Sequence, residues 1–173
     1  MQKQSKVSSW KAIAIATGDW HIHNFREYSD ESEGGITRLD WQVSVIKHMA
    51  EASFKHNCPV LFTGDMFHDP KELTNEAIEI FIMYWKKYMM PVPVYAISGN
   101  HDQSQKNTPN HPSPSYVKTF AETFSNLKCL DNDYIKLSDM TIYGIPYYTN
   151  NKGFLKRVKG YSKMAKYDKG TTI

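Results

Sequence analysis

Residues 59–70 read PVLFTGDMFHDP, an apolar run that ends at Gly64 and Asp65 and continues to His68 and Asp69. A short apolar run between a proline and a glycine is typical of a buried β-strand. The glycine permits a tight turn and a close approach of the backbone to a ligand. Carboxylate and imidazole groups directly after a strand are residue types that bind metals or catalyse reactions. This stretch therefore predicts a strand that carries chemistry at its carboxyl end.

Two other apolar runs end in the same way. Residues 11–17, KAIAIAT, are followed by GDWHIH, and residues 94–98, VYAIS, are followed by GNHD. One such ending is weak evidence for a site, but three parallel strands would bring three endings to the same edge of a sheet. The polar residues that follow these two strands are Asp19, His21 and His23, and Asn100, His101 and Asp102.

Several segments outside the predicted strands have apolar residues at helical spacing. Apolar residues recur at helical spacing over 36–56, 73–89 and 154–167, Thr74 is the expected N-cap of the second segment, and a short helix is expected over 115–125. The apolar runs YIKL and MTIYGIP flank Ser138 and Asp139, which predicts a hairpin. The residues that define the three longer helices are Leu39, Val43, Ile46, Ala50 and Phe54; Ile78, Phe81, Ile82, Trp85 and Met89; and Phe154, Val158, Tyr161 and Ala165.

Strands that alternate with helices predict an α/β fold with a mainly parallel sheet. The second, strand-rich part predicts either a mixed sheet or a second sheet stacked on the first. The length of 173 residues corresponds to about one domain. No stretch has the length of a membrane span, and the polar N-terminus is not a signal peptide. We therefore expect a cytoplasmic protein without membrane attachment, in which Cys58 and Cys129 are reduced thiols.

The residues at the three strand ends suit a centre with two divalent metal ions. Asp19 and His21 are two positions apart, so in extended backbone their side chains point the same way and bind one ion together. Asp65 follows the middle strand in chain order and is best placed to bridge two ions, while Asn100 offers a carbonyl oxygen. Mixed His, Asp and Asn ligands fit Mn²⁺, Zn²⁺ or Fe. Two such ions about 3.5–4 Å apart activate a water for attack on a phosphodiester.

The remaining polar residues have several interpretations. His101 is free to donate a proton or to stabilise the transition state. His68 is a residue beside the metal ligands, a substrate contact or a helix cap. His23 lies two positions after His21, just beyond the first pair of ligands. Asp69 precedes Pro70 and is typical of a turn, whereas Asp102 is typical of a residue that orients its loop. The other histidines, His48, His56 and His111, are expected at the surface.

The motif set D-x-H, GD and GNHD resembles that of the calcineurin-like metallophosphoesterases. Within that superfamily the chain looks like the nuclease subunit of SbcCD-type DNA repair nucleases, including phage versions. The stretches that carry this finer resemblance are GDWHIH, GDMFHDP, GNHD, NHPSPS and YGIPYY. The resemblance covers roughly residues 11–150, and the three-part motif is more specific for the superfamily than for the nuclease.

This resemblance implies a four-layered α/β sandwich and a DNA exonuclease or endonuclease that depends on Mn²⁺, with Zn²⁺, Fe²⁺ or Mg²⁺ as alternatives. Asp19 and His21 would hold the first metal, Asp65 would bridge, and Asn100 would hold the second. His101 would be the transition-state histidine, and His68 would help to place the DNA strand. The implied partners are DNA and an SMC-like ATPase, with which the chain would form a heterotetramer. A homodimer of this chain is compatible with that assembly. A phage-encoded protein would work in the host cytoplasm.

The chain departs from the family pattern in two places. Ile22 and His23 follow the D-x-H motif where the family has small or apolar residues. The family also supplies three later metal-binding histidines, one alone and then an H-x-H pair, whereas this chain has no histidine after His111. We therefore expect residues 1–173 to be the N-terminal part of a single metallophosphoesterase domain, with 1–10 disordered and GTTI opening the next strand. On their own these residues are expected to bind metal weakly and to cleave little or no substrate.

Three functions stay open on the sequence alone. The first is hydrolysis of DNA, the second is hydrolysis of another phosphoester such as a nucleotide or phosphoprotein, and the third is a non-catalytic binding or assembly role. Charge bears on this choice, because residues 151–173 carry seven basic residues against Asp168 alone, and the rest of the chain is net acidic. The basic segment is either the solvated face of a helix or a phosphate contact.

Overall fold

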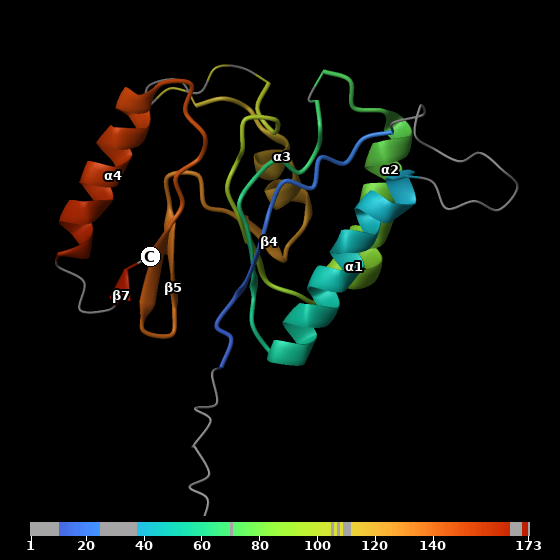
Figure 1. The fold of residues 1–173 in the computed structure, drawn as a ribbon, viewed down its shortest axis with the longest axis horizontal. Helices are drawn as coiled ribbons and strands as arrows, with labels where there is room; N and C mark the ends of the chain where they lie inside the picture. The colour runs from blue at the N-terminus through green and yellow to red at the C-terminus, as the bar shows by residue number, and fades with distance from the viewer. Residues whose placement is uncertain are drawn as a thin grey trace, which may run out of the picture.

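Four parallel strands form the first sheet of the computed structural model, which describes residues 11–24, 38–69, 71–104, 106, 108, 112–166 and the backbone of 171–172. The order in the sheet is β1–β2–β3–β4 (Figure 1), so that successive strands are neighbours. Their carboxyl ends therefore meet at one edge, as the sequence predicts. The strands are β1 (Ile15–Thr17), β2 (Val60–Phe62), β3 (Val94–Ala96) and β4 (Leu127–Cys129).

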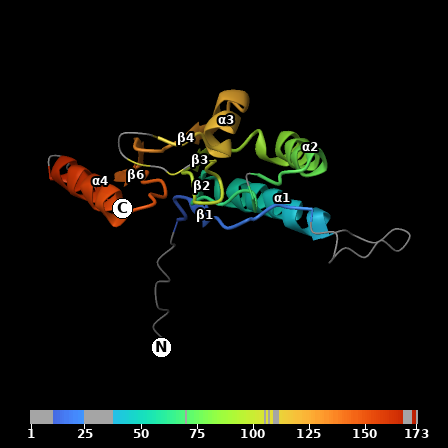
Figure 2. The same ribbon diagram turned by 90° about the horizontal axis from the view of Figure 1, so that it is seen from above.

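Three helices cover one face of this sheet, and a fourth lies on the opposite side of the molecule (Figure 2). Thr74 caps α2, since its Oγ1 accepts a hydrogen bond from the Ala77 N–H at 3.2 Å, which confirms the expected N-cap. α2 continues into a π-helical turn, η2, before Pro91 and Pro93. The helices are α1 (Arg38–His56), α2 (Asn75–Tyr84) with η2 (Trp85–Met89), α3 (Tyr116–Thr123) and α4 (Asn151–Ala165).

A second, three-stranded sheet lies between the first sheet and α4 (Figures 1 and 2). β5 (Tyr134–Leu137) and β6 (Met140–Tyr143) pair antiparallel around a turn in which Ser138 has φ of 57°, as the predicted hairpin requires. β7 (Thr171–Thr172) pairs parallel with β6. The result is helices, sheet, sheet and helix, the four-layered α/β arrangement that was expected.

The main hydrophobic core lies between the first sheet and helices α1 to α3. Val60, Phe62 and Val94 point into it from the strands, and Phe81 and Trp85 close it from α2 and η2. These side chains are at most 2% exposed. The core fixes the sheet rigidly against the helices and so fixes the loops at the carboxyl ends of the strands. None of the described helices combines the length and the apolar character that a membrane crossing requires.

Two details of the sequence prediction are wrong. Phe54 was placed on the buried face of α1, but it is 58% exposed, and Ser53 is buried in its stead. Ser53 tolerates burial because its hydroxyl donates to the Cys58 carbonyl, at 2.5 Å, where the helix ends. The prediction also omitted β4, whose three residues, LKC, are too short to show periodicity; pairing with β3 defines the strand.

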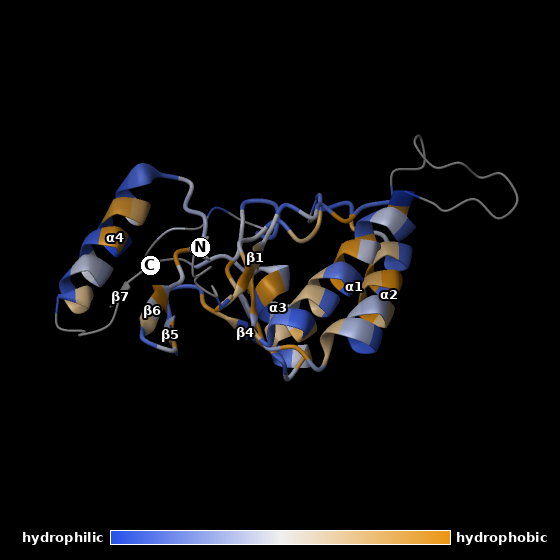
Figure 3. Cartoon of the chain, turned by 60° about the horizontal axis from the view of Figure 1, so that its bottom comes forward, coloured by the Kyte–Doolittle hydropathy of each residue, from blue (hydrophilic) through white to orange (hydrophobic). Residues whose placement is uncertain are grey.

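Helix α4 packs loosely on the second sheet. Tyr161 stacks on Tyr143 of β6 with ring centroids 4.5 Å apart, and Arg157 Nε donates to the Tyr148 hydroxyl at 3.3 Å. Phe154 and Val158, which belong to the predicted apolar stripe, are nevertheless 47% and 38% exposed. Figure 3 shows hydrophilic and apolar patches alternating around this helix. The stripe faces the sheet but is only partly covered by it.

Residues 1–10, and all but Asn24 of the acidic loop predicted at 24–35, lie outside the described residues. His111 and parts of the loop around it do so too. His48 and His56 are exposed on α1, as expected. Both cysteines are free, Cys58 buried and Cys129 partly buried.

Candidate metal centre

Backbone hydrogen bonds continue beyond the ends of β1 and β2 and hold the two following loops side by side. The Asp19 N–H donates to the Gly64 carbonyl, and the His21 N–H donates to the Asp65 carbonyl, each at 3.0 Å. A further pair joins Ile22 to Met66, also at 3.0 Å. The metal-ligand residues of the first strand end are therefore placed directly beside those of the second.

The ligand residues adopt a left-handed backbone conformation, whereas extended backbone was expected for Asp19 and His21. Asp19, His21 and Asp65 have φ of 54°, 46° and 60°. Such values are uncommon for residues with a side chain and cost of order 1–3 kcal/mol each. The expectation that Asp19 and His21 lie in extended backbone is therefore wrong, although their side chains still lie close together. Backbone strain of this kind at a loop that carries ligands is typical of a functional site.

Three side chains offer one metal-ligand atom each within a small volume. Asp19, His21 and Asp65 have their ligand atoms within 4.8 Å of one another, and His21 Nε2 lies 3.7 Å from Asp19 Oδ1. Two carboxylate oxygens and one imidazole nitrogen are a donor set that fits Mn²⁺, Zn²⁺ or Fe²⁺. The residues that were predicted to hold the first metal are thus brought together by the fold.

A second group of ligand atoms is formed by three histidines. His21, His68 and His101 also have ring nitrogens within 4.8 Å of one another. The His68 and His101 rings stack at 5.6 Å, and the His21 ring meets His101 edge-on at 4.7 Å. His68 and His101 therefore border the same centre from the loops after β2 and β3.

The proton on His101 is placed by a short contact between its Nδ1 and the His68 carbonyl oxygen. A carbonyl oxygen only accepts hydrogen bonds, so Nδ1 is the donor and carries a proton in this contact. Nε2 is then the ring nitrogen available to a ligand or to a substrate. When the ring is doubly protonated, Nε2–H is the group that donates a proton.

The carboxylate of Asp65 is held by the loop after β3. Its Oδ1 accepts a hydrogen bond from the His101 N–H at 2.8 Å. A Cβ on Gly99 would lie 2.2 Å from the same oxygen, so only glycine allows this close approach. The predicted bridging ligand is thus fixed in orientation by groups of the neighbouring strand end.

Asp102 is buried beneath the centre and clamps the two loops together. Its carboxylate accepts three backbone N–H groups, from Asp65 at 2.7 Å, Met66 at 2.8 Å and Gly99 at 2.9 Å. Burial raises the pKa of Asp102 to about 6, the three N–H donors oppose that shift, and the nearby Asp65 carboxylate adds to it. The residue therefore orients the ligand loops and is itself 1% exposed.

Asp102→Asn is expected to lower the free energy of unfolding by about 2 kcal/mol. An amide has one oxygen, so its NH₂ group must face at least one of the three backbone donors. Urea unfolding followed by circular dichroism measures the change. Asp69→Asn is the matched control and should change stability by less than about 0.5 kcal/mol. Among the residues that the structure describes, the Asp69 carboxylate accepts the Lys71 N–H, at 2.8 Å, in a turn that asparagine also forms. Equal destabilisation by both variants would contradict the clamp.

Asn100 lies beside a surface hollow of about 370 Å³ next to Asp65. Its side chain is exposed. The hollow is walled by the loop after β3, by the 145–148 segment and by the start of α4, including Tyr147 and Phe154. The predicted ligands of a second metal, Asp65 and Asn100, therefore open onto one shared space.

Two supporting groups were not predicted. Gln42 of α1 donates to the His21 carbonyl at 2.9 Å and accepts the His23 N–H at 3.2 Å, so it braces the first ligand loop. Asp131, after β4, accepts the Ser98 N–H at 2.8 Å and the Ser98 hydroxyl at 2.7 Å. Both contacts join segments that are distant in sequence, and no local motif signals them. His23 itself stands next to the His68 ring, with centroids 5.5 Å apart.

The three ligand loops, the four-layered fold and the cluster of Asp19, His21 and Asp65 define a metal-dependent phosphoesterase. The chain belongs to the calcineurin-like phosphoesterase family, whose model matches residues 14–170. A comparison with curated proteins finds no match to the chain. The superfamily expected from the motifs is thereby confirmed, together with a metal-dependent hydrolase of phosphoesters.

Proposed function

We propose that this protein is a nuclease that hydrolyses DNA phosphodiesters with two divalent metal ions, Mn²⁺ foremost. The observation that carries the proposal is the convergence of Asp19, His21 and Asp65 at the carboxyl ends of β1 and β2. Asp65 would serve both metals, which is supported by its place in this cluster and in the lining of the hollow beside Asn100. The metals, when bound, would polarise the phosphate and supply a nucleophilic water.

The protein's own side chains would hold the reacting groups in place. Asp19, His21, Asp65 and Asn100 would hold the metals. His101, with its Nδ1–H on the His68 carbonyl, presents Nε2 to the substrate. In the imidazolium form this atom donates a proton to the leaving oxygen as the phosphodiester bond breaks. His68 would position the strand, and Asp102 would keep both loops in register.

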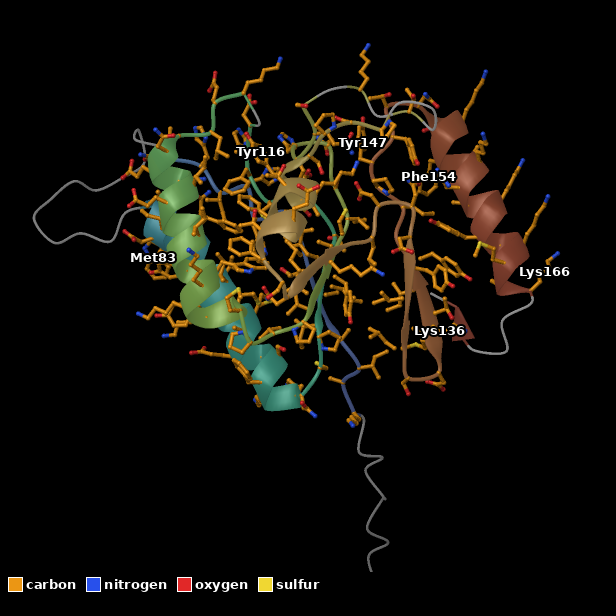
Figure 4. The ribbon with its side chains drawn as sticks, turned by 180° about the vertical axis from the view of Figure 1, so that it is seen from behind. Met83, Tyr116, Lys136, Tyr147, Phe154 and Lys166 are labelled. Carbon is orange, nitrogen blue, oxygen red and sulfur yellow. The ribbon has the colours of Figure 1, made fainter. Side chains whose placement is uncertain are left out.

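A polynucleotide suits the open shape of the site better than a small phosphoester does. Tyr147 and Phe154 line the hollow beside Asp65 and are each 47% exposed (Figure 4). Exposed aromatic rings next to a phosphate site are surfaces on which bases stack, at about 1–3 kcal/mol per base. This feature favours DNA over a nucleotide or a phosphoprotein, which are the second candidates.

The proposal includes an SMC-like ATPase as partner and the cytoplasm as the place of action, both from the resemblance of GDMFHDP and GNHD to SbcCD-type nucleases. Copurification of the chain with such an ATPase tests the first. A complex that forms only when both chains are expressed together is the expected result.

The direct test compares two substrates at saturating Mn²⁺. Linear duplex DNA and bis-p-nitrophenyl phosphate are incubated with the purified chain, and metal content is measured by mass spectrometry. Slow hydrolysis of both substrates is expected, with DNA preferred at equal phosphodiester concentration, because these residues on their own are expected to bind metal weakly. Hydrolysis of the small diester alone favours another phosphoester. A chain that binds no metal and cleaves neither substrate has a non-catalytic role. Long incubations are used so that slow hydrolysis is detected.

A further inference from the structure

One face of α4 carries four lysines in a regular row, and the helix contains no acidic residue. The lysines are spaced by four, three and four positions, so they stand above one another on one side of the helix. All four are exposed. Long nitrogen-tipped side chains extend from the outer side of α4 in Figure 4, whereas Phe154 lies on the inner side. This row, called the lysine ridge, consists of Lys152, Lys156, Lys159 and Lys163.

The lysine ridge does not stabilise helix α4. None of its lysines forms a salt bridge with an acidic residue in the part of the chain that the structure describes. Like charges three and four positions apart repel each other, and Lys152 in the first turn opposes the helix dipole. The helix is also held loosely by the second sheet. A ridge that lowers helix stability and that no described acidic side chain neutralises points to an external anion.

Gly160 lies within the ridge and has no packing reason to be glycine. A Cβ at this position would meet nothing within 4 Å, yet glycine inside a helix costs about 1 kcal/mol relative to alanine. Glycine allows a ligand to approach the helix backbone closely. The surface here forms a shallow depression of about 480 Å³ lined by Lys152, Leu155, Lys156, Lys159, Gly160 and Lys163.

The ridge begins in the first turn of α4, and that turn borders the hollow beside the candidate metal centre. Asn151 and Phe154, in the first turn of α4, line the same hollow as Asp65 and Asn100. From Lys152 to Lys163 the helix rises by about 16 Å. Duplex DNA presents a phosphate about every 3.4 Å along each strand, so the ridge spans about five nucleotides of one strand. The row of charges is therefore long enough to follow several nucleotides of a polynucleotide backbone that leads away from the site.

We propose that the lysine ridge binds the phosphate backbone of the nucleic acid whose diester lies at the metal centre. This rests on the proposed function and narrows its substrate to a polymer that extends several nucleotides beyond the bond cut. An acidic protein surface would also be attracted to the ridge. The row of single cations, and the position of the first turn of α4 at the edge of the phosphoester site, favour the backbone of a nucleic acid.

The test uses three variants of the full chain. The ridge variant combines Lys152→Gln, Lys156→Gln, Lys159→Gln and Lys163→Gln, and an arginine version of the same four positions keeps the charge. The matched control removes four exposed lysines from α1 and η2: Lys47, Lys55, Lys86 and Lys87. Binding to a labelled duplex is measured by fluorescence anisotropy in EDTA, over a range of salt concentrations, so that hydrolysis plays no part. Hydrolysis of bis-p-nitrophenyl phosphate is measured separately.

In the ridge variant the slope of log K against log salt is expected to be smaller in magnitude by about 3.6, which is about 0.9 for each of the four lysines. Its affinity at low salt should fall at least tenfold, while the arginine version and the control stay near the wild type. An unchanged slope in the ridge variant overturns the proposal, and so does an equal loss in the control. Displacement of DNA by polyglutamate at equal charge overturns the assignment to nucleic acid. Loss of DNA binding with intact diester hydrolysis leaves the phosphoesterase standing, so the two proposals fail separately.

Discussion

Asp65→Asn is expected to reduce Mn²⁺-dependent hydrolysis of bis-p-nitrophenyl phosphate by at least about 100-fold. Loss of a group that only supports a metal ligand typically costs 10–100-fold in affinity or activity, so loss of a charged ligand should cost at least the upper figure. Asparagine has nearly the same size and keeps an oxygen for the His101 N–H. The fold should therefore survive, and the effect should fall on the metals.

Metal binding gives a second measurement for the same variant. Isothermal titration with Mn²⁺ should show weaker binding in Asp65→Asn than in the wild type, because Asp65 is the residue shared by the cluster with Asp19 and by the hollow beside Asn100. Asp139→Asn is the control, since this residue is exposed in the hairpin between β5 and β6, away from the loops that carry the ligands. Retention of wild-type hydrolysis by Asp65→Asn would remove the two-metal proposal.

Local sequence patterns predicted the position of the candidate metal centre, but they did not predict the backbone conformation of its ligand residues. Three short apolar runs that each end in glycine and a polar ligand residue predict parallel strands whose ends meet, because strand direction alone brings these ends together. The left-handed backbone of Asp19, His21 and Asp65 is imposed by hydrogen bonds between the two loops. Such bonds join residues more than forty positions apart, and nothing in the local sequence encodes them.

The residues that brace the loops around the metal centre could not be predicted for the same reason. Gln42 looks like a solvent-facing residue of an amphipathic helix, and only the packing of α1 beside the first loop places its amide between His21 and His23. Asp131 follows a strand too short to recognise. Asp102 was recognisable as a residue that orients its loop because it belongs to the GNHD motif, although its three backbone partners were not predictable.

The same contrast applies to the lysines of α4. Their number in residues 151–173 is plain from the sequence, and two interpretations, solvated face or phosphate contact, remained open. The fold adds that the first turn of α4 borders the hollow beside Asp65 and that no described acidic side chain neutralises the ridge. Position relative to the site, which charge counts omit, is the reason that we propose the phosphate contact.

Gly64→Ala is expected to destabilise the protein by more than about 3 kcal/mol, because two separate penalties combine. Gly64 has φ of 104°, a backbone conformation that side chains strongly disfavour. A Cβ there would also lie 2.5 Å from the Gly99 backbone nitrogen, in the loop of the adjacent strand. Relief of that contact requires the β2 and β3 ends to separate, which pulls Asp65 away from the His101 N–H.

Gly160→Ala provides the matched control, because the same substitution should there have the opposite sign. Position 160 is helical, has no positive φ, and has no atom within 4 Å of an added Cβ. Alanine should raise stability by about 0.5–1 kcal/mol through its better helix propensity. Urea unfolding of the two variants and the wild type measures both effects on one scale. Similar stability of Gly64→Ala and wild type would mean that the β2 and β3 ends are not in close contact. The geometry of the metal centre would then need a different support, since Asp65 owes its position to that contact.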